Sequence, residues 1–437
     1  MTSELLRRRR LVEKIYHKQD DTRGPGKWPL LGSKLEMMTW GKTTAVSAMN
    51  EAAHRYGDVV GLFTGDVPII LVSGLEAIKE VSSRDDFSGR PISIVQTDID
   101  KGSHGLIMAQ GEKWKEQRRF TLRNLKDLGF GKRSLEGIAH EEIEEVFEEI
   151  EKLSGGHKTG WKTPVLVQDI LGAAGINVLW HIIAGKRYSH NDPYLKNLMD
   201  NVKKLLKVSE IDGGVVATFP LLCKWFPFLT KLGEALKLRD TLHEFIQEEI
   251  RKHRESLDPE NPRDFIDIYI TEVDQQKENK LSTFEDKQLV FLCVDLFMAG
   301  SDTTFNTLTF AILYMILYPE KQQKVQEELD RVVGKDRLPS LEDRPNLPYV
   351  EATLSEILRQ SSVAPLSVPH ATLYGEKDAE LQGYFIPKNS ALLLNLYKVH
   401  HDPKIWGDPQ NFRPERFLDE NGKFVKHEAL IPFGLGD

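Results

Sequence analysis

The longest segment with the residue pattern of a helix, residues 285–317, constrains the fold more than any other feature. A run of this length indicates a buried helix, because strands usually extend over only about four to eight residues. Apolar residues at helical spacing predict further helices before and after it. They lie at 45–56, 111–128, 139–153, 168–184, 194–208, 230–256, 319–333 and 350–359.

Few segments of the chain have the pattern of strands. The runs 59–63 and 69–72 predict a hairpin, because a glycine and a proline separate them. Short strands are also expected at 384–386 and 392–395. Strands and helices do not alternate regularly, which argues against a doubly wound sheet. We therefore predict a mainly α fold with a small antiparallel β part.

The region 31–437 contains no segment with the composition of a linker and no internal repeat. We expect it to form a single domain, with two lobes as the alternative, after a basic tail and a Pro/Gly hinge at 1–30.

The net charge of −8 argues against a general nucleic-acid-binding protein, since such proteins are usually basic. Cys223 and Cys293 are too few for a disulfide framework and are typical of a reducing compartment.

The N-terminal tail has a basic cluster at residues 5–10, Leu-Leu-Arg-Arg-Arg-Arg. Such a cluster commonly lies on the cytoplasmic side of a membrane helix. The sequence has no apolar stretch of the roughly 18–20 residues that span a bilayer. A membrane-proximal segment and a solvated charged tail therefore remain alternatives for this region.

Small and polar residues interrupt the long apolar helix near its middle. Ala299 and Gly300 would let a flat group approach the backbone, and Asp302 and Thr303 place an acid and a hydroxyl beside that gap. A threonine in a helix can bond a carbonyl of the preceding turn or donate to a ligand. The alternatives are a ligand site and a packed helix with one buried polar cluster.

Charged residues at helical spacing mark two other places. Glu356 and Arg359 share one face of a helix, although most such pairs are surface contacts of small energy. Trp114 and Arg118 lie one turn apart, so their side chains point the same way. His370 is either a binding residue or a buried histidine with an internal partner.

These motifs occur together and in order, and the chain resembles a cytochrome P450, a haem-thiolate monooxygenase, over nearly its whole length. The resemblance is to the animal microsomal family of steroid, fatty-acid and xenobiotic hydroxylases. The matching motifs are W-x-x-x-R at 114–118, A-G-x-D-T-T at 299–304, E-x-x-R at 356–359, P-E-R-F at 414–417 and the start of F-x-x-G at Phe433 and Gly436.

The resemblance implies haem b with its iron as cofactor. Thr303 would then hydrogen-bond iron-bound dioxygen and Asp302 would help relay protons, which is general acid work. Ala299, Gly300 and Phe433 would lie against the haem.

The resemblance assigns the charged motifs to haem binding and to structure. Trp114, Arg118 and His370 would bind the haem propionates, which need fixed donors. A second set would form a buried structural triad that holds the loop carrying the ligand cysteine. Its members are Glu356, Arg359 and Arg416.

The resemblance also implies an NADPH-dependent flavin reductase, cytochrome b5 as a further electron donor, and residence on the cytosolic face of the endoplasmic reticulum membrane. Residues 215–229 would dip into the membrane, with core packing as the alternative. A lipophilic substrate fits the apolar segments 87–107, 195–208, 291–300 and 363–368. The reductase would dock on a basic face, for which a merely solvated surface is the alternative. The residues of this face are Lys113, Lys115, Arg119, Arg123, Lys126, Lys132 and Arg133.

The sequence departs from the family pattern at both ends. The cysteine ligand is expected beyond Asp437, as is the arginine that precedes it, and no membrane anchor is present. We therefore expect no metal ligand within this chain and no oxygenation by it alone, because the thiolate drives O–O cleavage. The alternatives are a non-catalytic relative that binds haem or lipid and an inert helical scaffold.

Overall fold

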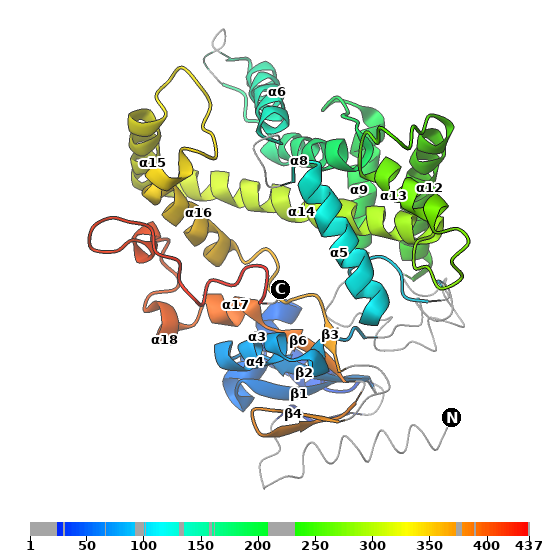
Figure 1. Cartoon of the computed structure of the whole chain (residues 1–437). Coiled ribbons are helices and arrows are strands. Elements are labelled where there is room, and N and C mark those ends of the chain that lie inside the picture. The colour runs from blue at the N-terminus through cyan, green and yellow to red at the C-terminus, as the bar shows by residue number, and fades with distance from the viewer. Residues whose placement is uncertain are drawn as a thin grey trace.

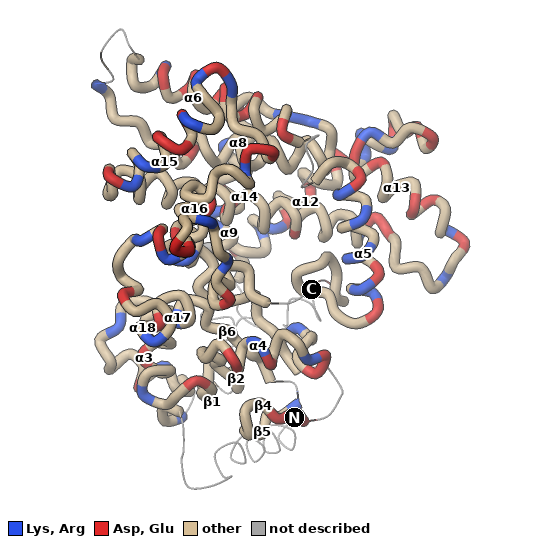
Figure 2. Tube along the Cα trace, turned by 60° about the vertical axis from the view of Figure 1, so that its left-hand side comes forward, with Lys and Arg blue, Asp and Glu red and all other residues tan. Residues whose placement is uncertain are grey.

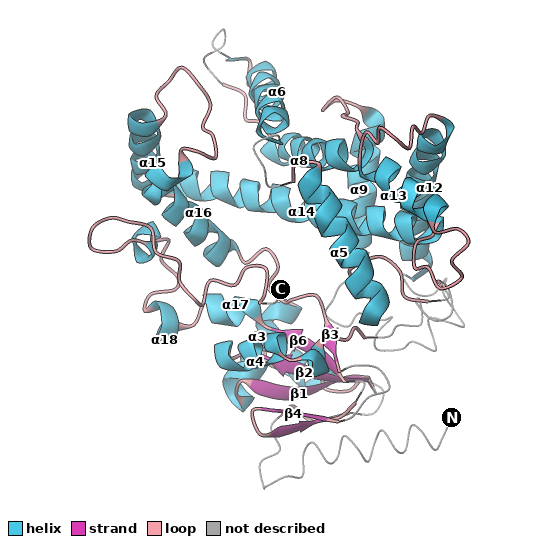
Figure 3. Ribbon diagram, viewed as in Figure 1, coloured by secondary structure: helices cyan, strands magenta, loops and turns pink. Residues whose placement is uncertain are grey.

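The computed structural model shows a helical body with small sheets at one end of it (Figures 1 and 3). The basic tail, residues 215–229 with Cys223, and Gly436 lie outside the described residues. The described residues are 24–28, 31–65, 67–91, 100, 102–130, 135–156, 160, 162–208, 232–372, 378–388 and 390–435.

Every predicted helix is present, and several shorter ones were not predicted. The 3₁₀ turns lie at Asp85–Phe87, Arg344–Asn346 and Pro414–Phe417. The helices are α2 (Lys34–Thr39), α3 (Ala45–Tyr56), α4 (Leu75–Ser83), α5 (Gly111–Asp127), α6 (Glu136–Ser154), α8 (Val167–Ala184), α9 (Pro193–Val208), α12 (Leu232–Glu255), α13 (Phe265–Gln275), α14 (Asp286–Leu317), α15 (Pro319–Val332), α16 (Pro348–Ser361), α17 (Leu396–His400) and α18 (Pro403–Trp406).

Helix α14 crosses the middle of the helical body (Figure 1). Its first half is apolar on most sides, with Leu289, Leu292 and Phe297 buried in the main core. Helices α5, α8, α9, α12 and α13 contribute most of the other residues of this core. A helix that is hydrophobic all round has to be enclosed in this way, which is why the sequence places it at the centre.

The main sheet has the strand order β1-β2-β6-β3, formed by Val59–Thr64, Val67–Val72, Ala391–Leu394 and His370–Ala371. The β1–β2 hairpin is antiparallel, as expected. The β3–β6 pair, which was not predicted, is antiparallel as well. Strands β2 and β6 are parallel, which is possible because most of the helical body lies between them in the sequence. A second antiparallel sheet pairs β4 (Ala379–Leu381) with β5 (Tyr384–Ile386).

Among the described helices, α8 is the one that is long and apolar enough to cross a membrane, which corrects the expectation that the sequence has no apolar stretch of that length. Half of that helix is buried inside the protein, where it packs against α14 and α6.

Candidate functional site

The middle of α14 presents Ala299 and Thr303 on one exposed face. They are four residues apart, which brings their side chains to the same side of a helix. The hydroxyl of Thr303 donates to the carbonyl oxygen of Ala299 at 2.7 Å. A rotation about one side-chain bond would redirect this hydroxyl to a ligand on that face.

Gly300 faces the neighbouring helix instead of this open face. A Cβ atom at Gly300 would lie 2.6 Å from Cδ2 of Leu179, so the glycine permits close packing of α8 on α14. This corrects the expectation that Gly300 leaves room for a flat group. Ala299 keeps that position on the exposed face.

Asp302 lies at the junction of α14 with α8 and α9. It accepts a hydrogen bond from Asn306 at 3.0 Å and lines a cavity of about 10 Å³ together with Ser301 and Lys203. Burial raises the pKa of Asp302, while the charge of Lys203 and the Asn306 bond oppose the shift. Asp302 and Thr303 are therefore adjacent in sequence but bonded to different partners.

Cationic side chains gather between α5 and β3. The guanidinium of Arg118 lies 5.2 Å from the ring centre of Trp114. Burial lowers the pKa of Arg90, and the charge of Arg118 lowers it further. Arg90 also lies 3.3 Å from Nδ1 of His370. The structure thus brings the three predicted propionate ligands into one neighbourhood, with Arg90 as an additional member.

Arg90 is the site residue that the sequence analysis missed. Its Nε donates to the carbonyl of Ile107 at 2.9 Å, and its backbone N–H donates to Gln110 at 3.0 Å. Within the described part of the chain, no carboxylate pairs with its guanidinium. A partly buried cation without a carboxylate favours a bound anion. A single arginine in a loop follows no pattern that would have revealed this.

His370 is a neutral histidine in this cluster. Burial, and secondly the charge of Arg90, lower the pKa of His370 to about 4. Nη1 of Arg90 and the carbonyl oxygen of Phe87 both lie 3.3 Å from Nδ1 of His370. Arginine can only donate, so when Nδ1 accepts from it Nε2 carries the proton. That N–H is then a donor for an anionic group.

The carboxylate of Glu356 receives four hydrogen bonds. Arg359 donates from Nε at 2.7 Å and from Nη2 at 2.8 Å, Arg416 donates from Nε at 3.1 Å, and the backbone N–H of Arg413 donates at 2.8 Å. Glu356 and Arg359 are fully buried. The structure therefore brings the predicted triad together as a buried ion cluster.

This cluster also binds the chain that follows α17. Arg359 donates to the carbonyl oxygens of His400 at 2.7 Å and Pro409 at 3.0 Å. Arg416 donates to the carbonyl of Trp406 at 2.9 Å. One ion cluster therefore joins α16 to the segment that leads toward Phe433.

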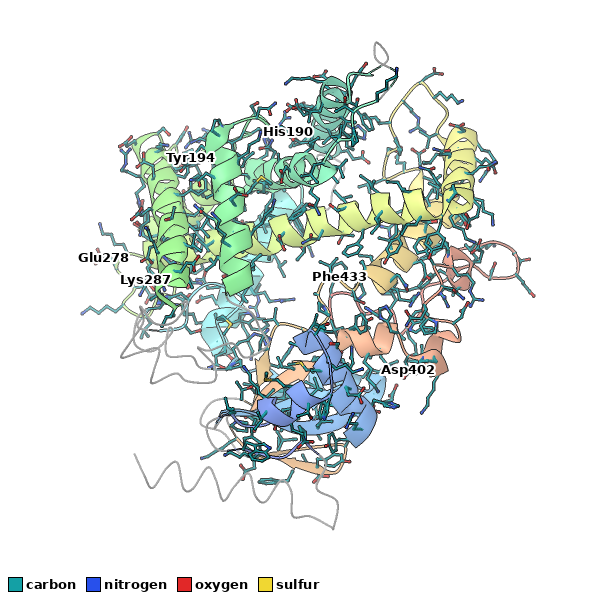
Figure 4. The ribbon with its side chains drawn as sticks, turned by 180° about the vertical axis from the view of Figure 1, so that it is seen from behind. His190, Tyr194, Glu278, Lys287, Asp402 and Phe433 are labelled. Atoms are coloured by element: carbon teal, nitrogen blue, oxygen red, sulfur yellow. The ribbon has the colours of Figure 1, made fainter. Side chains whose placement is uncertain are left out.

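Phe433 is 87% exposed and lies between α14 and the N-terminal elements drawn in blue (Figure 4). Its ring therefore points away from the core of the described protein.

The predicted docking face on α5 has a mixed charge (Figure 2). Lys115 pairs with Glu112 at 2.9 Å and Lys113 pairs with Glu285 at 3.5 Å. Arg119, Arg123 and Lys126 are exposed, whereas Lys132 and Arg133 lie outside the described residues.

The predicted substrate-lining segment 195–208 packs largely into the protein core instead of lining a pocket. In α9, the side chains of Leu195, Leu198 and Val202 are buried in the main core. Much of this segment therefore packs against neighbouring helices.

Residues 22–437 match the family model for cytochrome P450. The chain belongs to this family of monooxygenases, and membership implies a haem cofactor with its iron. Farnesoate epoxidase from Bombyx mori is 35% identical over 416 residues, which are 94% of this chain and 82% of that protein. Cytochrome P450 2C23 from Rattus norvegicus is 37% identical, over 94% of this chain and 81% of its own length. Cytochrome P450 2B4 from Oryctolagus cuniculus is 35% identical, over 94% and 82%.

Proposed function

We propose that this chain is the catalytic domain of a monooxygenase that holds haem b and inserts one atom of dioxygen into a lipophilic substrate. Family membership supports the reaction class. The observation that carries the proposal is the partly buried guanidinium of Arg90, which has no carboxylate partner in the described chain. It lies beside a neutral histidine donor and the Trp114–Arg118 pair.

The donors in this cluster suit the two carboxylates of a haem. Arg90 and Arg118 offer planar forks that match a carboxylate, and His370 offers a single N–H. The exposed Ala299–Thr303 face of α14 offers a surface without bulky side chains. When bound, haem would supply an iron that binds and activates dioxygen, with electrons from the reductase.

Thr303 and Asp302 of this chain would hold and transfer the protons that the reaction needs. Thr303 keeps a proton on Oγ1, bonded to the carbonyl of Ala299 until a ligand competes for it. Asp302 has a raised pKa and adjoins a cavity about large enough for one water. Asp302 can therefore take up and release a proton on the side of α14 that faces α8 and α9. Lys203 and its partner Asp169, 3.1 Å apart, would lie between Asp302 and the solvent.

The substrate, partners and location follow from family likeness and remain part of the proposal. The name of the Bombyx mori relative gives farnesoate as its substrate, which agrees with a lipophilic substrate here. Electrons would come from an NADPH-dependent flavin reductase, with cytochrome b5 as a further donor. The reductase would dock on the exposed basic residues of α5. The protein would act on the cytosolic face of the endoplasmic reticulum membrane.

A non-catalytic protein that binds haem or lipid is the second candidate. A relative that had lost catalysis would be expected to lose residues needed only for turnover. Asp302 and Thr303 are both present. This favours the enzyme.

Haem retention tests the proposal. The unchanged protein, expressed with a haem precursor, is compared with Arg90→Gln and with Arg84→Gln, a control whose arginine pairs with Glu80 and Asp86. We expect Arg90→Gln to weaken haem binding about tenfold or more, the value of a charge-assisted hydrogen bond, and Arg84→Gln to leave it unchanged. Equal haem content in all three proteins would contradict the proposal. Haem binding without substrate oxidation would favour the second candidate.

A further inference from the structure

His400, the last residue of α17, is buried and uses its two ring nitrogens differently. The backbone N–H of Ile431 lies 3.0 Å from Nε2 of His400. An amide can only donate, so Nε2 must be the unprotonated nitrogen. The proton is then on Nδ1, which lies 2.9 Å from Oγ of Ser362. The contacts therefore assign one neutral tautomer to His400.

Ser362 connects this histidine to the buried ion cluster. It follows α16 in the left-handed conformation with φ of 38°, which is uncommon for a residue other than glycine. Its Oγ donates to the carbonyl of Arg359 at 2.8 Å, and Arg359 donates back to the carbonyl of His400 at 2.7 Å. These bonds form a closed ring of three residues.

The backbone of segment 429–434 is hydrogen-bonded to this ring through Ile431, and the side chains of Ala429 and Ile431 pack in a hydrophobic core cluster. Its other backbone hydrogen bonds are local: Leu430 to His427 at 3.0 Å and Gly434 to Ile431 at 3.0 Å. Among described residues, the bond to His400 is the one that joins the backbone of this segment to a residue outside 427–434. Ile431 itself is 2% exposed, so its amide has no access to water as a substitute partner.

We infer that His400 is a positioning residue that transmits the position of the Glu356–Arg359 ion cluster to the backbone of residues 429–434. Phe433 lies in this segment, two residues after the amide that His400 binds. The inference rests on the proposed function only where it makes this segment part of the haem site. Burial, with the charges of His401 and Arg359, lowers the pKa of His400 to about 3, so the neutral ring persists at physiological pH.

Hydrogen exchange of this chain without haem tests the inference. Mass spectrometry of a peptide covering 429–434 is compared between the wild type, His400→Gln, His400→Asn and His401→Gln. Asparagine can reach Ser362 but is too short for Ile431, so we expect exchange of that amide to rise about tenfold. Glutamine extends as far as Nε2 and should restore much of the protection. His401→Gln, the adjacent control, should match the wild type.

Three results would overturn the inference. The first is unchanged exchange at 429–434 in His400→Asn. The second is an equal effect of His401→Gln. The third is loss of protection throughout α16 and α17 in both His400 variants, which would make His400 a general packing residue. Haem content of the same proteins, expressed with a haem precursor, is measured separately. A wild type without haem would contradict the proposed function and leave the exchange result valid.

Discussion

The carboxylate of Asp295 on α14 accepts the backbone N–H of Ile107 at 2.9 Å. The same oxygen accepts the N–H of Leu106 at 2.6 Å. The carbonyl of Ile107 in turn accepts from Nε of Arg90 at 2.9 Å. One loop residue therefore connects the central helix to the cation cluster. This makes the geometry of the proposed haem site dependent on a side chain that would not contact haem itself.

A second residue of α14 holds the same loop. The side-chain amide of Gln288 accepts from the N–H of Gly105 and donates to its carbonyl, both at 3.1 Å. Gly105 has φ of 75°, and a Cβ atom there would lie 2.2 Å from Oδ2 of Asp295. Both the backbone conformation and the lack of space therefore require glycine at this position.

We predict that Asp295→Ala will destabilise the protein more than Asp295→Asn. Alanine leaves the N–H groups of Leu106 and Ile107 without their partner, at a cost of about 1–3 kcal/mol. The amide oxygen of asparagine can accept both bonds. Urea denaturation measures the difference. Equal stability of the two variants would show that these hydrogen bonds do not hold the loop.

The ionisation of Asp295 gives a pH dependence of known sign. Burial raises the pKa of Asp295 to about 6 from its ordinary 3.8, although the two N–H bonds oppose the shift. The folded protein therefore holds this proton more tightly, and the contribution of Asp295 to stability falls as pH rises from about 4 to 6. Unfolding of Asp295→Asn should lack this component. Parallel stability curves for both proteins over that interval would refute the prediction.

Arg359→Ala should lower the free energy of unfolding by about 3–5 kcal/mol, because it leaves the buried Glu356 without its main partner. We also expect little haem-loaded protein, because the ion cluster supports the chain leading to Phe433. Arg251→Ala is the control: Arg251 pairs with Glu248 and Glu255 in exposed positions, and its loss should leave stability nearly unchanged. Normal haem loading of Arg359→Ala would contradict the role of the cluster.

Thr303→Ala should separate dioxygen consumption from product formation in the monooxygenase that we propose. The Thr303 hydroxyl lies on the exposed face of α14 beside Ala299. Without it, we expect at least about tenfold less product for each dioxygen consumed. Thr309→Ala removes a similar helix bond, from Thr309 to the carbonyl of Phe305 at 2.8 Å, and serves as control. An unchanged ratio in Thr303→Ala would exclude the proposed role.

The protein should become less stable at alkaline pH, because His253 then loses the proton that stabilises the fold. Its Nδ1 lies 2.7 Å from the carbonyl of Glu249 and its Nε2 lies 2.9 Å from Asp264. Both partners accept, so both nitrogens carry protons. Burial alone would lower the pKa of His253, but the bonds to Asp264 and Glu249 outweigh it and raise the pKa above its ordinary 6.5.

The resulting stabilisation is complete below pH 6.5 and is lost as pH rises through the raised pKa. Thermal unfolding should show a fall in Tm over that interval in the wild type and a smaller fall in His253→Gln. The exposed His54→Gln serves as the control and should follow the wild type. A wild-type Tm that is constant with pH would show that His253 is not held as a cation.

The sequence predicted helices wherever the apolar spacing ran long enough, as in α14. It missed α13 (Phe265–Gln275), although the side chain of Asp264 caps this helix by accepting from the N–H of Asp267. It also gave no sign that β2 and β6 pair in parallel. Such pairing depends on residues more than 300 positions apart, which local periodicity does not encode.

Sequence alone determined the mainly helical fold and the identity of the motifs, because spacing and residue type are local properties. Only the tertiary structure decided that Arg90 joins the cation cluster, that Gly300 faces Leu179, and that Asp295 binds Ile107. Each of these contacts joins segments distant in the sequence. Their energies depend on burial and on the partner's position, and both are set only when the helices pack.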